Sequence, residues 1–290
     1  MRPLVVDVFP YNGEPIVERR LRYLAPVVDV FVVVEARHTF SGIRKPELYT
    51  RTHKHVFEPY ADKVEFMIID EFPPVCPEWA SFARACRPWV QGNVDDWWRE
   101  SFQRDAVTVV LKGMHSPERP LLALVCDSDE IPSQEAIATL VEEYDVVAAR
   151  PAVHLAMAFH YYGWEWTKPE PWARAFAIAG ARLDGTSFDE ERNVVPVALL
   201  PGAGWHCSYF MPASEVARKI RSFSHREFCT DAILDPCNIA GALAGGVDVM
   251  GRHDAPLLPT APATLAALPP ELRDTPAKAS KSSASNEGGA

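Results

Sequence analysis

Residues 121–132 read Leu-Leu-Ala-Leu-Val-Cys-Asp-Ser-Asp-Glu-Ile-Pro, so six apolar residues run directly into three carboxylates within four positions. The apolar run is typical of a β-strand that is buried on both faces. Its end places the charges of Asp127, Asp129 and Glu130 at a strand tip, where they are unfavourable unless a cation neutralises them. Mg²⁺ or Mn²⁺ would suit this position, because these ions take one or two protein carboxylates and complete their shell with water and phosphate oxygens.

Two other interpretations of these residues stay open at this point. In the first, Asp127 and Asp129 cap the following helix or face solvent in a turn. In the second, the D-x-D pattern belongs to a phosphatase that uses an aspartate nucleophile. That motif normally opens its domain, whereas residues 1–120 precede it here, and Ile131 stands where Thr or Val is usual.

Similar apolar runs lie on both sides of this segment. They predict strands over residues 4–9, 27–35, 64–69 and 145–149. Apolar residues at helical spacing predict helices over residues 16–24, 97–111 and 133–144, the last with Ser133 as its N-cap. Strands that alternate with helices predict an α/β sandwich with a mostly parallel sheet. Ligands of such sheets bind at the carboxyl ends of the strands, so the residues after each strand are candidates for a site.

The composition describes an ordinary globular chain of 290 residues, with 48% hydrophobic and 23% charged residues. A net charge of −10 argues against a surface that attracts nucleic acid or anionic lipid as a whole. The six cysteines form no C-x-x-C pair, which indicates reduced thiols and a cytoplasmic location. Because no stretch approaches 18 apolar residues, we expect no stable membrane insertion.

The C-terminal part of the chain has a different composition. From Pro259 onward, Pro, Ala, Ser, Thr and Gly dominate, and no aromatic residue occurs. Such a segment buries too little apolar area to offset the entropy lost on ordering. We therefore predict one domain over residues 1–258 and a disordered tail over residues 259–290.

Five blocks in order along the chain resemble glycosyltransferase family 17. The first runs from Asp7-Val8-Phe9 through Asn12-Gly13-Glu14 to Glu18-Arg19-Arg20-Leu21, and the second from Val28-Asp29 through Val34-Glu35 to Thr39-Phe40-Ser41-Gly42 and Lys45-Pro46. The third pairs Trp98-Arg99-Glu100 with Gln103-Arg104-Asp105-Ala106, where Asp105 replaces the usual Asn. The fourth is Asp127-Ser128-Asp129-Glu130-Ile131-Pro132, and the fifth is Gly204-Trp205-His206-Cys207-Ser208. The resemblance covers roughly residues 4–251.

This resemblance implies a GT-A-like, Rossmann-type fold and an inverting transfer from a nucleotide-sugar. The implied donor is a UDP-sugar, with N-acetylglucosamine as the sugar, and the implied cofactor is Mn²⁺ or Mg²⁺. The acceptor stays open between a glycan, a glycolipid or lipid-linked saccharide, a protein and a modified base in nucleic acid. A metal-dependent phosphatase or nucleotidyltransferase built on the D-x-D residues, and a sugar-binding module without activity, remain as alternatives.

The resemblance also suggests the residues of the metal and the reaction. It implies Asp129 as a direct metal ligand and catalytic residue, Asp127 as a contact of the metal shell or ribose, and His206 as a further ligand. An inverting transfer needs a base for the acceptor proton. Glu227 is favoured because it matches an acidic position of the family. The competing acidic run is Asp189-Glu190-Glu191.

Substrate contacts are predicted from residue type and position. Candidates for the donor are Asp127, Glu35, Arg20, Arg104 and Thr39, although each arginine would equally pair with Glu18 or Glu100 on its own helix. The aromatic-rich segment 159–166, with Trp172 nearby, is suited to stacking on a sugar, and the alternative is a buried β-hairpin. The predicted acceptor contacts are Trp164, Trp166, Tyr162 and Trp205.

Overall fold

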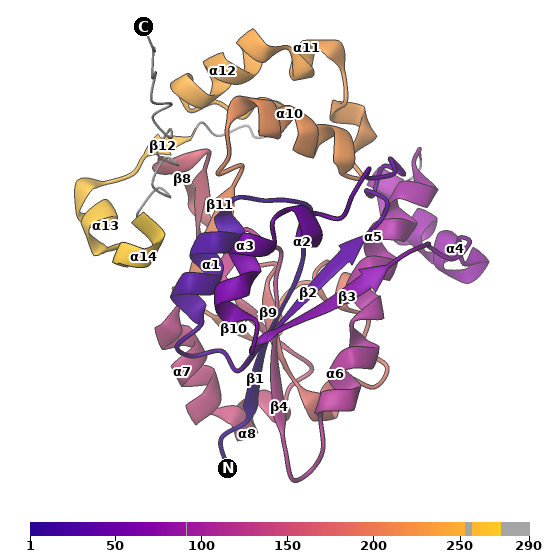
Figure 1. Cartoon of the computed structure of the whole chain (residues 1–290), viewed down its shortest axis with the longest axis vertical. Coiled ribbons are helices and arrows are strands. Elements are labelled where there is room, and N and C mark those ends of the chain that lie inside the picture. Colours follow the sequence, from indigo (N-terminus) through magenta and orange to yellow (C-terminus); the bar gives the residue numbers. More distant parts are fainter. Residues whose placement is uncertain (91, 253–256, 274–290) are drawn as a thin grey trace, which may run out of the picture.

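The computed structural model describes residues 1–90, 92–252 and 257–273. Its central sheet has seven strands in the order β10-β6-β9-β4-β1-β2-β3 (Figure 1). These strands are β1 (Leu4–Pro10), β2 (Val30–Ala36), β3 (Val64–Ile69), β4 (Leu121–Val125), β6 (Val153–Leu155), β9 (Phe176–Ala179) and β10 (Leu199–Leu200). Strand β1 pairs in parallel with β2 and β4, and β2 with β3, while β9 is antiparallel to β4 and β6. The predicted α/β class with a mostly parallel central sheet is therefore confirmed.

A second sheet has five strands in the order β12-β8-β7-β11-β5. Its strands are β5 (Glu130–Pro132), β7 (Met157–Tyr161), β8 (Gly163–Trp172), β11 (Gly204–Ser208) and β12 (Leu258–Pro259). The helices are α1 (Ile16–Leu24), α2 (Tyr49–Thr52), α3 (Lys54–Phe57), α4 (Pro77–Cys86), α5 (Val94–Ala106), α6 (Thr108–Met114), α7 (Gln134–Glu142), α8 (Tyr144–Ala148), α9 (Phe188–Glu191), α10 (Ala213–Ser222), α11 (Asp231–Leu234), α12 (Pro236–Gly245), α13 (Pro262–Ala267) and α14 (Pro270–Arg273). Among the described residues, four short 3₁₀ helices lie between these elements: Glu58–Tyr60, Pro88–Val90, Gly180–Arg182 and Arg226–Phe228.

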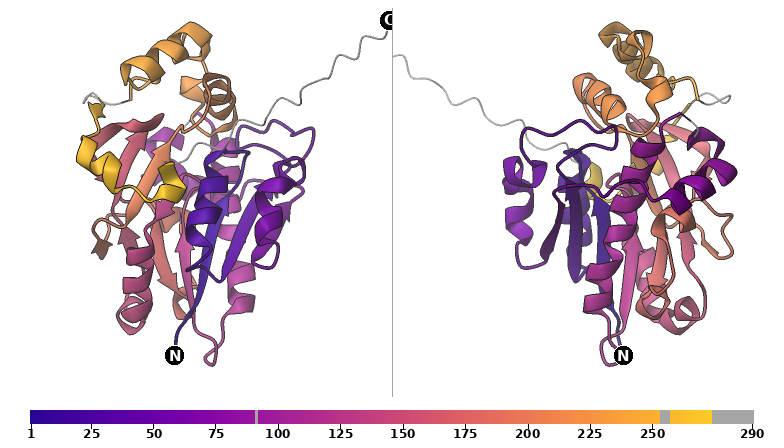
Figure 2. Two further views of the ribbon diagram at one scale, coloured as in Figure 1. Left: turned by 60° about the vertical axis from the view of Figure 1, so that its left-hand side comes forward. Right: turned by 90° about the vertical axis from the view of Figure 1, so that its right-hand side faces the viewer.

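The central sheet is covered on both faces because its strands carry apolar residues in both directions. In β1, Val5 and Phe9 belong to the core shared with α1 and α7, whereas Val6 and Val8 belong to the core on the α6 side. This is the alternation of side chains expected for a strand. Figure 1 shows α1 and α7 on one side of the sheet and α5 and α6 on the other. Figure 2 shows α10, α11 and α12 gathered at the end of the molecule opposite the N-terminus.

Two of the predicted elements differ from the structure. Residues 145–149 were predicted as a strand, but the helix α8 covers Tyr144–Ala148 and only Val147 of it is buried. A short apolar run cannot distinguish a strand from a helix by its period alone, which explains the error. The predicted helix over residues 97–111 is two helices, α5 and α6, that meet at Val107. Ser133 caps α7 as predicted, since its side chain accepts a hydrogen bond from the Ala136 N–H.

The prediction of a disordered tail is wrong for residues 259–273. This segment forms the end of β12 and the helices α13 and α14, and Leu268 and Leu272 are buried. The carbonyl oxygen of Leu272 accepts hydrogen bonds from Arg19 on α1 and from Trp164 on β8. A few leucines are enough to order this segment because they pack onto a core that the rest of the chain already forms. The average composition of the segment therefore underestimated the apolar area that it buries. Residues 274–290 lie outside the described residues.

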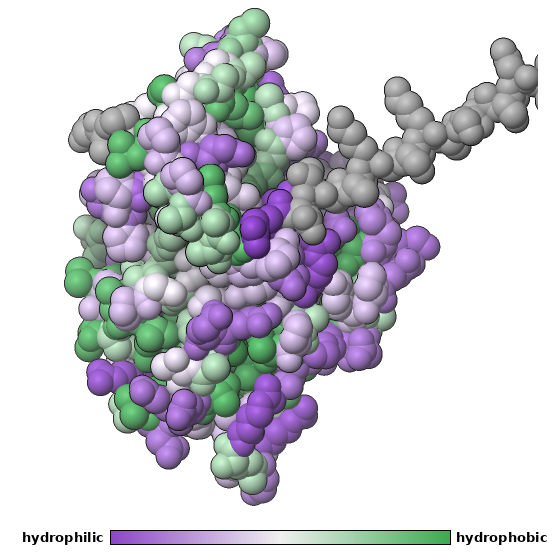
Figure 3. Space-filling model, turned by 90° about the vertical axis from the view of Figure 1, so that its left-hand side faces the viewer, coloured by the Kyte–Doolittle hydropathy of each residue, from purple (hydrophilic) through white to green (hydrophobic). Residues whose placement is uncertain are grey.

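The face that carries α13 and α14 shows no broad apolar band. Figure 3 shows hydrophobic and hydrophilic residues interspersed over this side of the molecule. Within residues 1–90, 92–252 and 257–273, no helix combines the length and the apolar character that crossing a bilayer requires.

Candidate active site

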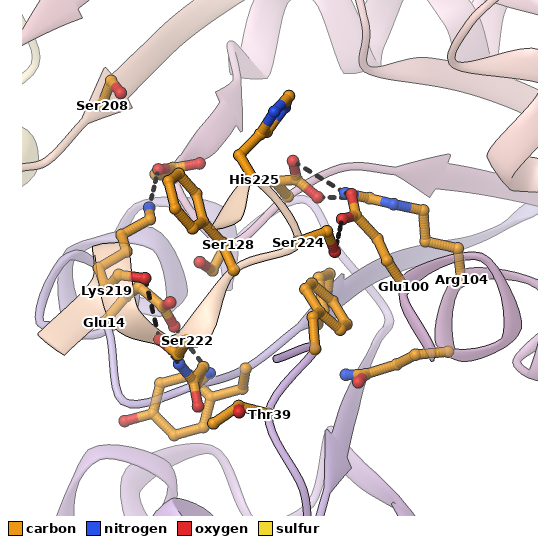
Figure 4. A pocket seen from close by; sticks show the side chains of 18 of the residues that line it. Glu14, Thr39, Glu100, Arg104, Ser128, Ser208, Lys219, Ser222, Ser224 and His225 are labelled. Atoms are coloured by element: carbon orange, nitrogen blue, oxygen red, sulfur yellow. Dashed lines mark hydrogen bonds and ion pairs between the residues drawn. The ribbon is translucent and has the colours of Figure 1, made fainter. Parts of the chain in front are cut away.

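A cavity lies where the parallel strands end. Its walls include Tyr11 after β1, Thr39 after β2 and the segment Asp127-Ser128-Asp129 after β4. The opposite wall comes from α10 and the following loop, through Lys219 and residues 222–225. Figure 4 shows Lys219 and Arg104 at opposite sides of the view, with Ser128 between them. The cavity therefore lies at the carboxyl edge of the sheet, where α/β proteins bind their ligands.

Asp127 is fixed by two arginines. Arg104 on α5 places Nη1 2.5 Å from Asp127 Oδ1, and Arg192 places Nη2 2.8 Å from Oδ2. Arg192 also pairs with Glu130 at 2.8 Å, and the Asp127 N–H donates to Glu130 Oε2. Burial would raise the pKa of Asp127, but Arg104 and Arg192 outweigh it and hold the pKa well below its ordinary value. The carboxylate is therefore ionised and both of its oxygens are occupied.

Arg20 holds the acidic loop, residues 127–130 after β4, in place. Its guanidinium pairs with Asp7 at 2.6 Å, and neither side chain is exposed. The same group donates hydrogen bonds to the backbone carbonyl oxygens of Asp127 and Glu130. Arg20 thus connects α1 and β1 to the loop after β4 and does not line the cavity. Its predicted role in donor binding is not kept.

Asp129 has a different environment. Its Oδ2 accepts from Lys219 Nζ at 2.7 Å, and its Oδ1 lies 3.6 Å from His206 Nε2. Burial would raise the pKa of Asp129, but the positive charge of Lys219 lowers it below the ordinary value. Both Asp129 and Lys219 line the cavity. Asp129 is thus an ionised carboxylate at the cavity wall with one lysine as its main partner.

His206 is held in place by two aromatic rings. Its imidazole stacks on Phe159 at 4.5 Å between centroids, and Trp172 lies 4.5 Å away on a tilted plane. Trp172 is fixed in turn by a hydrogen bond from Nε1 to Glu130 Oε1. Burial lowers the pKa of His206, so the ring is neutral near pH 7 and has a lone pair for a ligand. Its buried Nδ1 has no hydrogen-bond partner among the described residues.

Two of the three predicted metal ligands fit a divalent ion. The 3.6 Å between Asp129 Oδ1 and His206 Nε2 is slightly wider than the spacing of about 3 Å between neighbouring ligands of an octahedral ion. Asp127 does not fit, because Arg104 and Arg192 occupy its oxygens. Among the described residues, no cluster of three or more His, Cys, Asp or Glu side chains could hold a metal ion. Any ion would therefore need oxygens from a substrate or from water.

The other predicted donor contacts divide into two groups. Arg104 and Thr39 line the cavity together with Asp127. Glu35 does not, because its fully buried carboxylate accepts from Lys45 Nζ at 2.9 Å and from the Tyr49 and Thr50 N–H groups. It fixes the loop after β2, and its predicted contact with the donor is not kept.

The predicted acceptor aromatics do not line this cavity, and the alternative of a packed β-hairpin describes them better. Trp164 and Tyr162 lie on or beside the β7–β8 hairpin, and Trp164 is buried. Trp166 packs beside Gly246, and Trp205 meets Tyr23 edge to face. The aromatic side chains that do line the cavity are Tyr11, Phe40, Trp172, Tyr209 and Phe223.

Glu227 also lies outside the cavity, but it contacts a residue that lines it. His225 Nδ1 is 2.6 Å from Glu227 Oε1, and His225 belongs to the cavity wall. The competing acidic run lies in α9, where Asp189 pairs with Arg87 and Glu191 with His154. None of the three acidic residues of α9 lines the cavity among the described residues.

Several residues of the site were not singled out from the sequence. Arg192 and Lys219 neutralise the carboxylates, and Glu14 adds a further acidic side chain to the cavity. Glu14 lies within the first block that resembles the family, which was the available signal, whereas Lys219 lies outside all five blocks. Arg192 carries no such signal, because it reaches Asp127 from a chain position 65 residues away.

The chain is similar to several known proteins. The model of glycosyltransferase family 17 matches residues 4–256. β-1,4-Mannosyl-glycoprotein 4-β-N-acetylglucosaminyltransferase from Homo sapiens is 24% identical over 251 residues, covering 77% of this chain and 44% of the relative. The Rattus norvegicus protein of the same name is also 24% identical, with 43% of its length covered. The chain thus spans under half the length of these relatives.

A solved structure is also similar to this chain. It is a mannosyltransferase from Pyrobaculum calidifontis in complex with GDP-Man and Mn²⁺, at 13% identity and a TM-score of 0.39, covering 76% of this chain and 61% of the other.

Proposed function

Because the chain belongs to glycosyltransferase family 17, we propose that it transfers a sugar from a nucleoside diphosphate sugar to an acceptor hydroxyl. The observation that carries this proposal is the cavity at the strand ends, where Asp129 lies between His206 and Lys219 and Arg104 faces the same space. Cationic side chains beside a potential metal ligand suit a diphosphate, whose negative charge grows as the glycosidic bond breaks.

The proposed cofactor is Mn²⁺ or Mg²⁺, held by Asp129 and His206. When bound, such an ion supplies Lewis-acid stabilisation of the departing diphosphate. The protein contributes the fixed position of His206, because Phe159 and Trp172 hold its imidazole ring. Arg104, which is anchored by Asp127 and Glu100, adds positive charge to the same wall.

The proposed donor is UDP-N-acetylglucosamine. The sugar follows the printed names of the relatives, which are N-acetylglucosaminyltransferases. Thr39 and Phe40 line the cavity in the loop after β2, and this position supports a proposed contact with the nucleoside end of such a donor. Glycans, glycolipids, proteins and modified nucleic-acid bases all remain candidate acceptors. A cytoplasmic location stays a prediction.

For the base we propose His225, with Glu227 as the residue that orients it. The acceptor oxygen would attack the anomeric carbon, the bond from that carbon to the diphosphate oxygen would break, and the acceptor proton would pass to the imidazole. His225 is accessible from the cavity, and Glu227 accepts from its Nδ1 and leaves Nε2 for the substrate. The sequence predicted Glu227 as the proton acceptor, and this assignment gives that role to its hydrogen-bond partner His225.

A phosphatase with an aspartate nucleophile is less compatible with the site. Its first aspartate must be free to attack, whereas Arg104 and Arg192 hold both oxygens of Asp127. The test is a thermal-shift screen of nucleotide-sugars with and without Mn²⁺, followed by hydrolysis assays on the best ligand and on phosphomonoesters. We expect UDP-sugars to raise the melting temperature in the presence of Mn²⁺. Turnover of phosphomonoesters without any effect of nucleotide-sugars would refute the proposed transfer.

A further inference from the structure

The two aspartates of the acidic loop are neutralised by different kinds of cation. Asp127 has two guanidinium partners, and each is tied to another carboxylate, Glu100 for Arg104 and Glu130 for Arg192. Asp129 has one ammonium, Lys219, at 2.7 Å. A guanidinium is a rigid fork that holds a carboxylate at two points, whereas an ammonium is a point charge on a flexible four-carbon stem. The pairs around Asp127 are therefore fixed, and the pair at Asp129 is the one suited to exchange.

Lys219 can change partners without moving its helix. Its side chain is 21% exposed, while that of Asp129 is 7% exposed, so the ammonium lies toward the open side of the pair. Helix α10 is anchored separately, because Val216 and Ile220 are buried and Arg218 donates to the carbonyl oxygen of Asn12. Because Lys219 already lines the cavity, rotation about its side-chain bonds would bring the ammonium to a ligand there without a movement of α10.

The proposed metal site requires such a movement. A divalent ion on Asp129 would lie beside the Lys219 ammonium, and two cations that share one carboxylate repel each other. A diphosphate in the cavity offers the ammonium new oxygen acceptors. We propose that Lys219 is an exchangeable counter-ion, which holds Asp129 in the empty site and transfers to the donor diphosphate when a divalent ion takes the carboxylate. This inference rests on the proposed function.

The first experiment measures Mn²⁺ alone. Titration followed by the electron paramagnetic resonance signal of free Mn²⁺ gives the affinity of the wild type, Lys219→Met and Lys219→Arg. Lys219→Met removes the competitor, so we expect Mn²⁺ to bind at least about tenfold more tightly, a difference of about 1.4 kcal/mol. Lys219→Arg holds Asp129 more firmly and should weaken Mn²⁺ binding. The matched control is Arg221→Met, which removes one charge from an exposed position of the same helix and should change the affinity less than about twofold.

The second experiment measures UDP at saturating Mn²⁺ by calorimetry. Lys219→Met should weaken UDP binding by about tenfold or more, because the diphosphate loses a charged donor. The two affinities therefore change in opposite directions, whereas a merely structural role of Lys219 would weaken both. If Lys219→Met leaves Mn²⁺ binding unchanged or weakens it, the exchange is refuted; if that variant does not fold, tighter Mn²⁺ binding by Lys219→Arg refutes it.

The same measurements separate this inference from the proposed function. Wild-type protein that binds Mn²⁺ but no nucleoside diphosphate would refute the glycosyltransferase assignment and the exchange with it. Wild-type protein that binds both ligands, with both affinities weakened in Lys219→Met, would refute the exchange alone.

Discussion

Asp7 in β1 and Arg20 in α1 form an ion pair at 2.6 Å in which neither side chain is exposed. The remaining donors of the guanidinium reach the backbone carbonyl oxygens of Asp127 and Glu130. The first strand and helix of the chain therefore hold the acidic loop that follows β4. Arg20, which does not line the cavity, thus holds the backbone of Asp127, which does.

We expect Arg20→Met to destabilise the protein by about 3–5 kcal/mol, because it leaves the carboxylate of Asp7 buried without a partner. Urea denaturation gives the free energy of unfolding. The control is Arg2→Met, since the Arg2–Asp29 pair is exposed and its loss should change stability by no more than about 1 kcal/mol. Equal effects of the two substitutions would contradict the structural role of Arg20.

Leu272→Ala tests the docking of the C-terminal helices. Leu272 is fully buried in the core that includes α1, so truncation to Ala should lower the free energy of unfolding by about 2–5 kcal/mol. Deletion of residues 274–290, whose composition predicts disorder, is the matched control and should leave the melting temperature unchanged. If Leu272→Ala leaves the free energy of unfolding unchanged, the C-terminal helices contribute little to the stability of the protein.

Asp129→Asn and Asp127→Asn should differ in their effects. Asp129→Asn removes the proposed metal ligand and frees a partly exposed lysine, so transfer should fall by more than about 10²-fold with little loss of stability. Asp127→Asn leaves Arg104 and Arg192 facing each other and should lower stability as well as transfer. Transfer assays and thermal melts separate the two outcomes. Full activity of Asp129→Asn would show that the metal assignment is wrong.

His225→Ala should reduce turnover by roughly 10²–10⁴-fold while the affinity for the donor persists, as expected for loss of a general base. Glu227→Gln should have a smaller effect in the same direction, because it removes only the partner at Nδ1. Steady-state kinetics and calorimetry measure the two quantities. The control is Glu190→Gln, an exposed carboxylate of the acidic run in α9. If Glu190→Gln stops transfer and His225→Ala does not, the base lies elsewhere.

The pH dependence of stability follows from Asp127. Its pKa in the folded protein lies below the ordinary value of 3.8, so its contribution is complete above that value and is lost as the pH falls through the lower folded pKa. The difference in unfolding free energy between the wild type and Asp127→Asn should therefore be constant near neutral pH and shrink below about pH 4. Urea denaturation over a pH series measures it. A difference that grows on acidification would contradict the assignment, and Asp184→Asn, at an exposed pair, should show little difference at any pH.

The sequence by itself determined the parallel sheet and the place of the acidic loop. The strand Leu121–Val125 is apolar on both faces, and the carboxylates of residues 127–130 come shortly after it. These features are local, because the period of apolar residues reports burial. The family resemblance was equally readable, since its blocks occur in order along the chain.

Only the tertiary structure decided which charges meet. The sequence argument required a cation for the carboxylates and proposed a metal, whereas Arg104, Arg192 and Lys219 come from three separate elements to neutralise them. In the same way, Leu272 is buried only because α1 and β8 offer it a surface. Pairing and docking depend on contacts between residues distant in the chain, and neither the period nor the composition of a segment encodes such contacts.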